Sequence, residues 1–321
     1  MDDTPSARPT ELTPTQRRVL EELMAAGRSR PSFRESLADD LRGALETGLA
    51  GLVPHLPAEG LRVRKADLAQ VHACETHHLA ETGVPFDWHA RNARGVVAHK
   101  AIELSVSLDP SPPAVELVDL ALERLVEDDW EWGPGRWLSE APAVELAELR
   151  TFAADVVHKF QDEFPPLKRS WRPRLESSLA AVLCDGLVTL RGKVDLALGQ
   201  AQGTEARVMI VDFKTGQPAA THVDDLRYYA VLETLRVGVP PFRVASWYLD
   251  AGHWHHEDVD EDVLFAAVRR IVDGVVKLVE LQVDRRPPQV SPGPACGYCV
   301  LRAECSGALA WSEQRAEVGL A

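Results

Sequence analysis

The chain has 321 residues, of which 45% are hydrophobic and 26% charged, the balance of a globular protein with one large domain or two small ones. No apolar run approaches the roughly 18–20 residues of a membrane span, and residues 1–8 lack the layout of a signal peptide, so we expect a cytoplasmic protein outside the membrane. A net charge of −14 argues against nucleic-acid binding over the whole surface. A local basic groove is still compatible with it, because phosphate contacts act within roughly 8–10 Å.

Helical patterns dominate the first half of the chain, and strand patterns follow. After a loose arm at 1–13, the apolar spacing predicts helices at 17–26, 33–49, 66–82, 88–108, 114–129 and 143–164. The second half predicts strands at 174–183, 187–198 and 207–213, a helix at 222–237, a strand pair at 242–249 and 253–257, and a helix at 261–283. We therefore expect an α/β fold with a mixed central sheet of order βββαβ, flanked by helices and preceded by a largely helical N-terminal half.

A carboxylate and a lysine stand where the third predicted strand ends. Side chains alternate along a strand, so Asp212 and Lys214 share one face while their apolar neighbours point to the other. Asp212 can bind a metal ion, and Lys214 can orient or help to deprotonate the attacking water and stabilise developing charge. An isolated Asp-x-Lys is more often an ordinary solvated pair, so the motif alone is weak evidence for hydrolysis.

The preceding strand carries a second polar set. The same alternation places Arg191, Lys193 and Asp195 on one face. Two carboxylates at the ends of adjacent strands can share a hard cation such as Mg²⁺ or Mn²⁺, which takes oxygen ligands.

Three motifs follow one another in this region. Gly-Lys-Val-Asp ends at Asp195, Val-Asp-Phe-Lys-Thr-Gly spans 211–216, and the next helix carries Asp225 and, four residues on, Tyr229. In this order they resemble the RecB-like branch of the PD-(D/E)XK nucleases, which has a Gly-x-x-Asp strand, an (Asp/Glu)-x-Lys strand and a helix with Gln-x-x-x-Tyr. Asp225 departs from the family's glutamine, and it can either add a metal ligand or cap its helix.

The family also carries an earlier helix with Gly-x-x-x-His, and here Gly95 and His99 lie on one helical face at the expected place. A lone histidine in an amphipathic helix is usually structural, so a metal role for His99 depends on its position before the strands. The resemblance covers about residues 66–306 and implies a restriction-endonuclease-like core. It implies metal binding by His99, Asp195 and Asp212, assistance to the water by Lys214, and substrate positioning by Tyr229.

Four of the five cysteines form a suggestive set: Cys74, then Cys296, Cys299 and Cys305. Cys184 lies in an apolar strand-like run, which favours a core position. Thiolates suit both zinc and iron–sulfur clusters. One distant cysteine with a C-terminal trio is similar to the iron–sulfur RecB-like nucleases, including the CRISPR-adaptation and AddB-like members. This resemblance implies a structural [4Fe–4S] cluster, and zinc or unligated cysteines are the alternatives.

Basic and aromatic side chains suggest where nucleic acid would bind, although a solvated linker explains the stretch before the first strand equally well. The candidates are Arg91, Arg94, Lys168, Arg169, Trp171, Arg172, Arg191 and Lys193. We expect three regions: an arm and helical extension at 1–60, a nuclease domain at 61–310 with a helical insertion at about 110–170 and a cysteine-rich clamp, and a tail at 311–321.

The sequence thus favours a metal-dependent deoxyribonuclease, an exonuclease acting on single-stranded DNA or DNA ends in repair, recombination or defence. A helicase or another nucleic-acid-processing protein is a possible partner. The alternatives are a catalytically silent nucleic-acid-binding or scaffolding module on the same fold, and a zinc protein without nuclease activity. Retention of Asp195, Asp212 and Lys214 together disfavours the silent module, which has no need of all three.

Overall fold

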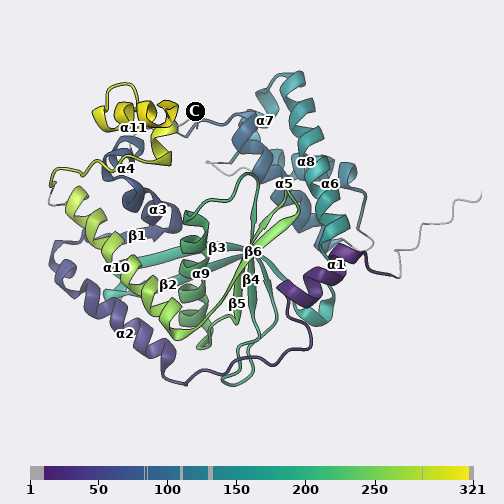
Figure 1. The fold of residues 1–321 in the computed structure, drawn as a ribbon, viewed down its shortest axis with the longest axis horizontal. Coiled ribbons are helices and arrows are strands. Elements are labelled where there is room, and N and C mark those ends of the chain that lie inside the picture. Colours follow the sequence, from purple (N-terminus) through teal and green to yellow (C-terminus); the bar gives the residue numbers. More distant parts are fainter. Residues whose placement is uncertain are drawn as a thin grey trace, which may run out of the picture.

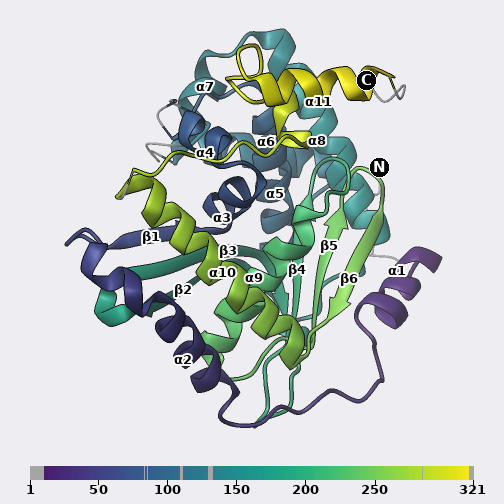
Figure 2. The same ribbon diagram turned by 60° about the vertical axis from the view of Figure 1, so that its left-hand side comes forward.

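A six-stranded mixed sheet runs through the middle of the protein, with helices on both faces (Figure 1, Figure 2). The computed structural model describes residues 11–82, 84, 86–108, 111–128, 133–283 and 285–317. The strands are β1 (Leu61–Arg64), β2 (Arg174–Leu183), β3 (Val188–Leu198), β4 (Met209–Lys214), β5 (Arg243–Tyr248) and β6 (His253–Asp258). The strands follow the order β1-β3-β4-β5-β6, and β2 also pairs with β3. The predicted α/β class, with a mixed sheet flanked by helices, is confirmed.

The helices occupy most of the remaining chain. They are α1 (Pro14–Arg18), α2 (Leu37–Leu49), α3 (Lys65–Ala73), α4 (Glu75–Glu81), α5 (Ala90–Ser107), α6 (Ala114–Glu127), α7 (Gly135–Glu140), α8 (Ala143–Glu163), α9 (Thr221–Val237), α10 (Glu261–Gln282) and α11 (Ser306–Glu317). Shorter π or 3-10 segments are η1 (Val19–Leu23), η2 (Ala50–His55), η3 (Arg169–Trp171), η4 (Cys184–Gly186) and η5 (Pro294–Gly297). No helix in these ranges is both long and apolar enough to cross a bilayer.

Each face of the sheet has its own apolar core. Helices α2, α9 and α10 cover one face, and α2 contributes four buried leucines at four-residue spacing, Leu37, Leu41, Leu45 and Leu49. Helices α5, α6 and α8 cover the other face. Strands β4 and β5 lie between these layers, and all six residues of β5 are buried. This explains why both strands read as continuous apolar runs with few polar positions.

The structure differs from the sequence prediction in three elements. Strand β1 was not expected, because only Val63 of its four residues is buried and so short a segment has no clear alternation of apolar and polar residues. The helix predicted at 66–82 is broken at Cys74, whose backbone is extended (φ −165°, ψ 118°), and forms α3 and α4 instead. Helix α7 also went unpredicted, since six residues give too short a period to detect.

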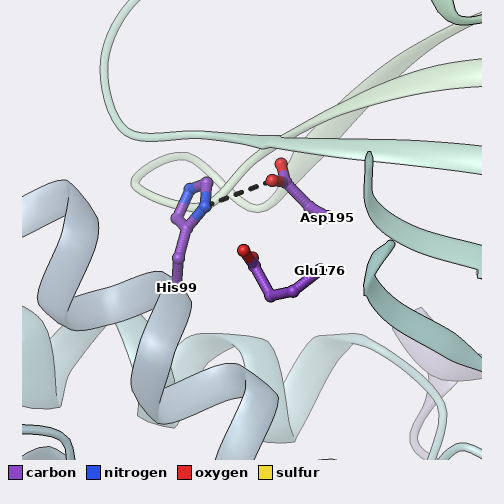
Figure 3. A group of neighbouring side chains, drawn as sticks. All are labelled: His99, Glu176 and Asp195. Atoms are coloured by element: carbon purple, nitrogen blue, oxygen red, sulfur yellow. Dashed lines mark ion pairs between the residues drawn. The ribbon is translucent and has the colours of Figure 1, made fainter. Parts of the chain in front are cut away.

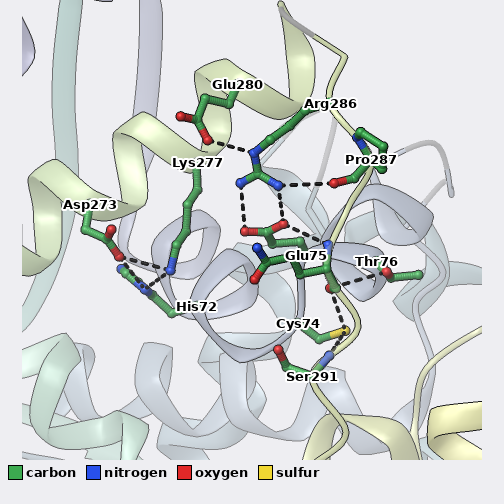
Figure 4. A network of polar contacts seen from close by, with 11 residues as sticks. His72, Cys74, Glu75, Thr76, Asp273, Lys277, Glu280, Arg286, Pro287 and Ser291 are labelled. Carbon is green, nitrogen blue, oxygen red and sulfur yellow. Dashed lines mark hydrogen bonds and ion pairs between the residues drawn. The ribbon is translucent and has the colours of Figure 1, made fainter.

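A charge cluster joins two segments that lie more than 200 residues apart in the chain. The chain that leaves α10 runs back beside α4, where Arg286 holds both carboxylate oxygens of Glu75 at 2.6 and 2.9 Å (Figure 4). The same guanidinium also contacts Glu280, and the backbone N–H of Gln289 donates to Glu75 at 2.9 Å. The Arg286 hydrogen bonds lower the pKa of Glu75 to about 2 against the effect of burial. Glu75 is 4% exposed, so its charge depends on these partners.

We expect Glu75→Gln to lower the free energy of unfolding by about 2 kcal/mol at neutral pH, because Arg286 loses the more buried of its two charged partners. The pKa of Glu75 is depressed from 4.5, so its stabilisation is present above pH 4.5 and is lost as the pH falls through about 2. Urea unfolding of wild type and Glu75→Gln from neutral pH down to about pH 3 should show the difference between their free energies of unfolding become smaller. Glu280→Gln is the control, with a smaller expected loss because Glu280 is 38% exposed. Equal stability of wild type and Glu75→Gln at neutral pH contradicts the prediction.

Candidate functional site

The sheet opens between β1 and β4. Strand β2 occupies one edge of β3, and both β1 and β4 lie on the other. On that edge, β1 pairs with residues 188–191 and β4 pairs with 196–198. Residues 192–195 of β3 therefore have no strand beside them on this edge in the described structure. The gap places side chains of several elements next to one another.

Asp195 lies where β3 and β4 begin to diverge. Its Oδ2 accepts a hydrogen bond of 2.6 Å from the backbone N–H of Phe213, immediately beyond the last paired residues, Leu196 and Val211. The carboxylate thus takes the place of a backbone carbonyl and satisfies a donor that the split would leave without a strand partner. Val194 belongs to one apolar core and Leu196 to the other, although residues two apart share a face in a regular strand. The strand β3 therefore also turns over at Asp195, between them.

His99 reaches the same point from α5 (Figure 3). Its Nδ1 lies 3.4 Å from Asp195 Oδ1. Burial disfavours the charged imidazole, but the Asp195 carboxylate outweighs burial and holds the pKa of His99 above its ordinary value. One turn earlier, a Cβ on Gly95 would lie 3.0 Å from Thr215 Oγ1, so the Gly-x-x-x-His spacing lets α5 approach the end of β4 closely.

Glu176 completes a group that can hold a metal ion. Ligand atoms of His99, Glu176 and Asp195 all lie within 4.8 Å of one another, and no other group of three such side chains does so in the part of the chain that the structure describes. Sequence analysis missed Glu176. Its backbone is left-handed (φ 48°), which turns the side chain out of the strand alternation, and nothing in a glutamate predicts that conformation. Lys193 forms an ion pair with Glu176 from the solvent side.

Asp212 is the most buried carboxylate of the site, at 2% exposure. Its Oδ1 accepts a hydrogen bond of 3.1 Å from Lys65 Nζ, and its Oδ2 lies 2.6 Å from Lys214 Nζ. Burial favours the protonated acid, but Lys214 and Lys65 outweigh it and keep the pKa of Asp212 below its ordinary value. The Lys214 contact lacks hydrogen-bond alignment, so Oδ2 is a buried oxygen without a hydrogen-bond partner among the described residues. Such an oxygen fits the donor set of a divalent cation.

Asp225 faces the same two lysines. Its Oδ2 lies 3.4 Å from Lys65 Nζ and 3.4 Å from Lys214 Nζ. Helix α9 begins at Thr221 without a side-chain cap, so Asp225 does not serve as the cap that its position allowed. Lys65 was missed as a site residue because it closes an ordinary basic run, Arg62 to Lys65, and its partners lie far along the chain.

Tyr229 forms a wall of the gap. It is 2% exposed, and the Lys65 ammonium lies 4.8 Å from the centre of its ring. Burial, followed by Asp212 and Asp195, raises the pKa of Tyr229, so the hydroxyl stays protonated. The ring packs directly over Gly192, where a Cβ would come within 2.7 Å of it. The glycine of the Gly-x-x-Asp motif therefore makes room for the tyrosine of the helix motif.

The predicted nucleic-acid contacts divide into two places. Arg191 and Lys193 are exposed beside the gap, Arg91 is exposed on α5, and the Arg94 guanidinium lies 4.4 Å from the Phe152 ring centre. The second group is Lys168, Arg169, Trp171 and Arg172. Trp171 is held by a hydrogen bond from Gly199 N to its carbonyl and lines a pocket with Met209, at the opposite end of β4 from Lys214. Five strand residues span roughly 17 Å, so the structure does not bring this second group to the gap.

A polar groove of about 820 Å³ adjoins the gap. Arg62 and Arg64 of β1 and Arg191 of β3 line it together with Asp67, Glu81 and Asp87, and Arg64 is paired with Asp67 at 2.8 Å. Phe86, which is 60% exposed, lies on the rim. Cationic and aromatic groups along one groove are the features that hold a single nucleic-acid strand.

The cysteine set occupies the far end of α3. Cys74 Sγ accepts a hydrogen bond of 3.4 Å from Ser291 N (Figure 4). Cys296 Sγ accepts one of 3.4 Å from Gly293 N. Cys299 is buried as well, and Cys305 is partly buried. Cys74 and the C-terminal trio therefore lie on neighbouring segments.

Cys184 is not part of this cysteine set. It packs against the apolar core as expected, but only partly buried and not within a strand, because it lies in the η4 turn after β2 with φ 51°. The turn of Cys184, Asp185 and Gly186 carries three successive positive φ values and directs the side chain to the edge of the core. Burial still raises the pKa of the Cys184 thiol.

Comparison with known proteins identifies the family. Residues 66–306 match the model of the PD-(D/E)XK nuclease superfamily. The chain belongs to this superfamily, and the fold is of the restriction-endonuclease-like type that the sequence predicted. Members hydrolyse nucleic acids and generally use divalent metal ions, so the protein is a nuclease with a nucleic-acid substrate.

Individual relatives are distant. No curated protein matches the sequence. A crystal structure designated SSO0001 is 14% identical, with 84% of this chain and 97% of that chain covered and a TM-score of 0.37. A candidate exonuclease from Eubacterium rectale is 10% identical, with 78% and 88% covered and a TM-score of 0.44. These scores are low, so the family rests on the sequence match.

We expect Gly192→Ala to destabilise the protein by about 1–3 kcal/mol, because the new methyl group overlaps the Tyr229 ring in a packed interior. The matched control is Gly43→Ala on the exposed side of α2, where a Cβ meets nothing within 4 Å and alanine favours the helix by up to about 1 kcal/mol. Urea unfolding measures both changes. A Gly192→Ala protein as stable as wild type means that Tyr229 does not pack on this glycine.

Proposed function

We propose that the protein is a Mg²⁺- or Mn²⁺-dependent deoxyribonuclease of the RecB-like branch, acting on single-stranded DNA or DNA ends. The observation that carries this proposal is the meeting of Asp195, Asp212 and Lys214 with His99 in the gap between β1 and β4. A packed core gains nothing from four carboxylates and two lysines in one gap, because taking these charges out of water costs free energy that apolar side chains would not cost.

The donors in the gap suit one divalent ion. His99, Asp195 and Glu176 supply three ligands, whose atoms lie within 4.8 Å of one another. Asp212 Oδ2, which has no aligned hydrogen bond, can supply a fourth once the Lys214 ammonium, 2.6 Å away, shifts from it. This set keeps the predicted ligands His99, Asp195 and Asp212 and adds Glu176. When bound, the ion polarises the scissile phosphate and lowers the pKa of a bound water.

The surrounding side chains prepare the reaction. Asp212 and Asp225 hold the Lys214 ammonium, so that it points into the gap at the end of β4. There it orients the attacking water and stabilises the charge that develops on the phosphate oxygens. Tyr229, whose hydroxyl stays protonated, closes the gap behind the substrate and excludes solvent from the charged groups.

The groove beside the gap supports a single strand as the substrate. Arg62, Arg64 and Arg191 can contact successive phosphates, and exposed Phe86 offers a ring face for a base. The ring of Trp88 braces Phe86 edge-on at 4.9 Å. The 168–172 segment, in which Lys168, Arg169 and Arg172 are exposed, then serves DNA that extends beyond the gap. A helicase or another nucleic-acid-processing partner would supply such strands, in repair, recombination or defence.

We also propose a structural [4Fe–4S] cluster bound by Cys74, Cys296, Cys299 and Cys305. The cluster belongs to the nuclease domain that we propose at 61–310, between an extension at 1–60 and a tail at 311–321. The hydrogen bond from Ser291 N to Cys74 Sγ supports a shared centre, because it holds the segment that leads into the C-terminal trio against Cys74. Backbone N–H donors to Cys74 and Cys296 favour thiolates.

We expect Asp212→Asn and Lys214→Met each to reduce cleavage of end-labelled single-stranded DNA by about 10²–10⁴-fold with Mg²⁺ or Mn²⁺, because each removes a charge that the reaction needs. Circular dichroism and thermal unfolding show whether the fold is kept. Asp119→Asn, which breaks a surface ion pair with Arg150, is the control and should cleave normally. Purified Asp212→Asn that cleaves at the wild-type rate, with contamination excluded, shows that the site is wrongly assigned.

We expect Cys74→Ala to lose the cluster and to lower the melting temperature, because the centre joins segments separated by more than 200 residues and adds its binding free energy to folding. Cys184→Ala is the matched control and should retain the cluster. Iron and acid-labile sulfide per chain, measured after anaerobic purification, test both variants. Loss of iron from Cys184→Ala but not from Cys74→Ala means that the fourth ligand is wrong, and wild type without iron means that there is no cluster.

A further inference from the structure

Lys65 is a half-buried cation that the nuclease motifs do not explain. It is the first residue of α3, directly after β1, and its side chain enters the gap to within 3.1 Å of Asp212 and 3.4 Å of Asp225. Its side chain is 25% exposed. A lysine placed there loses hydration and side-chain entropy, and its two carboxylate contacts must offset both.

The position of β1 fixes this lysine. The Tyr228 hydroxyl lies 3.0 Å from the carbonyl oxygens of both Val63 and Arg191, and so ties β1 to β3 two residues before Lys65. On the other side the Tyr229 ring lies under the ammonium. Two neighbouring tyrosines of α9 therefore hold the strand and the cation that follows it.

Lys65 and Lys214 divide the two oxygens of Asp212 between them. Lys65 holds Oδ1 by a hydrogen bond, whereas Lys214 contacts Oδ2 without hydrogen-bond alignment. In nucleases with two metal ions, the ions lie about 3.5–4 Å apart and a shared carboxylate binds both. Oδ1 of Asp212, facing Asp225, is where a second ion would bind, and that place holds the Lys65 ammonium.

We propose that Lys65 replaces a second divalent ion, so that the site binds a single ion at His99, Glu176 and Asp195. This inference rests on the proposed function. The charge distribution supports it: Asp212 and Asp225 are balanced by two lysines, whereas Glu176 and Asp195 share only His99 and the largely exposed Lys193. The need for a divalent charge is therefore greatest on the His99 side. The Lys65 ammonium supplies the second positive charge beside the scissile phosphate without depending on a dissolved ion.

The test is the number of Mn²⁺ ions bound by the full chain, read from the electron paramagnetic resonance signal of free Mn²⁺ during titration, without DNA or turnover. We expect one ion for wild type and none for His99→Ala. We expect two for Lys65→Met, because removal of the ammonium opens the position between Asp212 and Asp225. Lys65→Arg keeps the charge and should bind one. Lys65→Met combined with Asp225→Asn should return to one, because the new ion loses a ligand.

Lys100→Met is the matched control. Lys100 is 24% exposed and pairs with Glu103 at 3.1 Å on α5, so it resembles Lys65 in burial and pairing but lies outside the carboxylate group. It should bind one ion. Melting temperatures identify folded variants, and Lys65→Gln replaces Lys65→Met if the latter does not fold.

The outcomes separate the two proposals. A wild type that cleaves DNA and binds two ions overturns the role of Lys65 and leaves the nuclease proposal intact. A folded Lys65→Met protein that still binds one ion overturns it as well. A wild type that neither binds Mn²⁺ nor cleaves DNA overturns the proposed function, and the inference with it.

Discussion

The hydrogen bond from Phe213 N to Asp195 is the contact on which the site depends. It lets β3 and β4 separate without leaving a buried donor unsatisfied, and so makes room for side chains between β4 and β1. It also fixes the carboxylate whose other oxygen faces His99. A single side chain therefore ends the strand pairing, defines the edge of the gap and presents a ligand atom. Moving Asp195 would change all three at once.

Short-range periodicity predicted much of this arrangement. Strand alternation placed Asp212 and Lys214 on one face, helical spacing placed Gly95 and His99 on one face, and both agree with the structure. The same reasoning could not find Glu176, because its left-handed backbone breaks the alternation. Whether each of these residues acts in catalysis stays a prediction.

Lys65 marks the limit of sequence reasoning in a different way. Its partners lie about 150 residues away, and the strand that delivers it has four residues and one buried side chain. Periodicity cannot identify so short an element, and its place in the sheet is set by β3 and by the Tyr228 hydroxyl. Long-range contacts with no local signal are therefore the part of the site that only the structure reveals.

The break at Cys74 has a mechanical consequence. Helix α3 has Lys65 as its first residue and ends immediately before Cys74, so one rigid rod of nine residues, about 14 Å long, connects the cysteine set to the carboxylates of the gap. A helix of this length does not bend appreciably, and a tilt at its C-terminal end is transmitted to the other. The end of α3 beside Cys74 and the end that carries Lys65 are therefore expected to shift together. The packing around Cys74 thus affects the position of the Lys65 ammonium relative to Asp212.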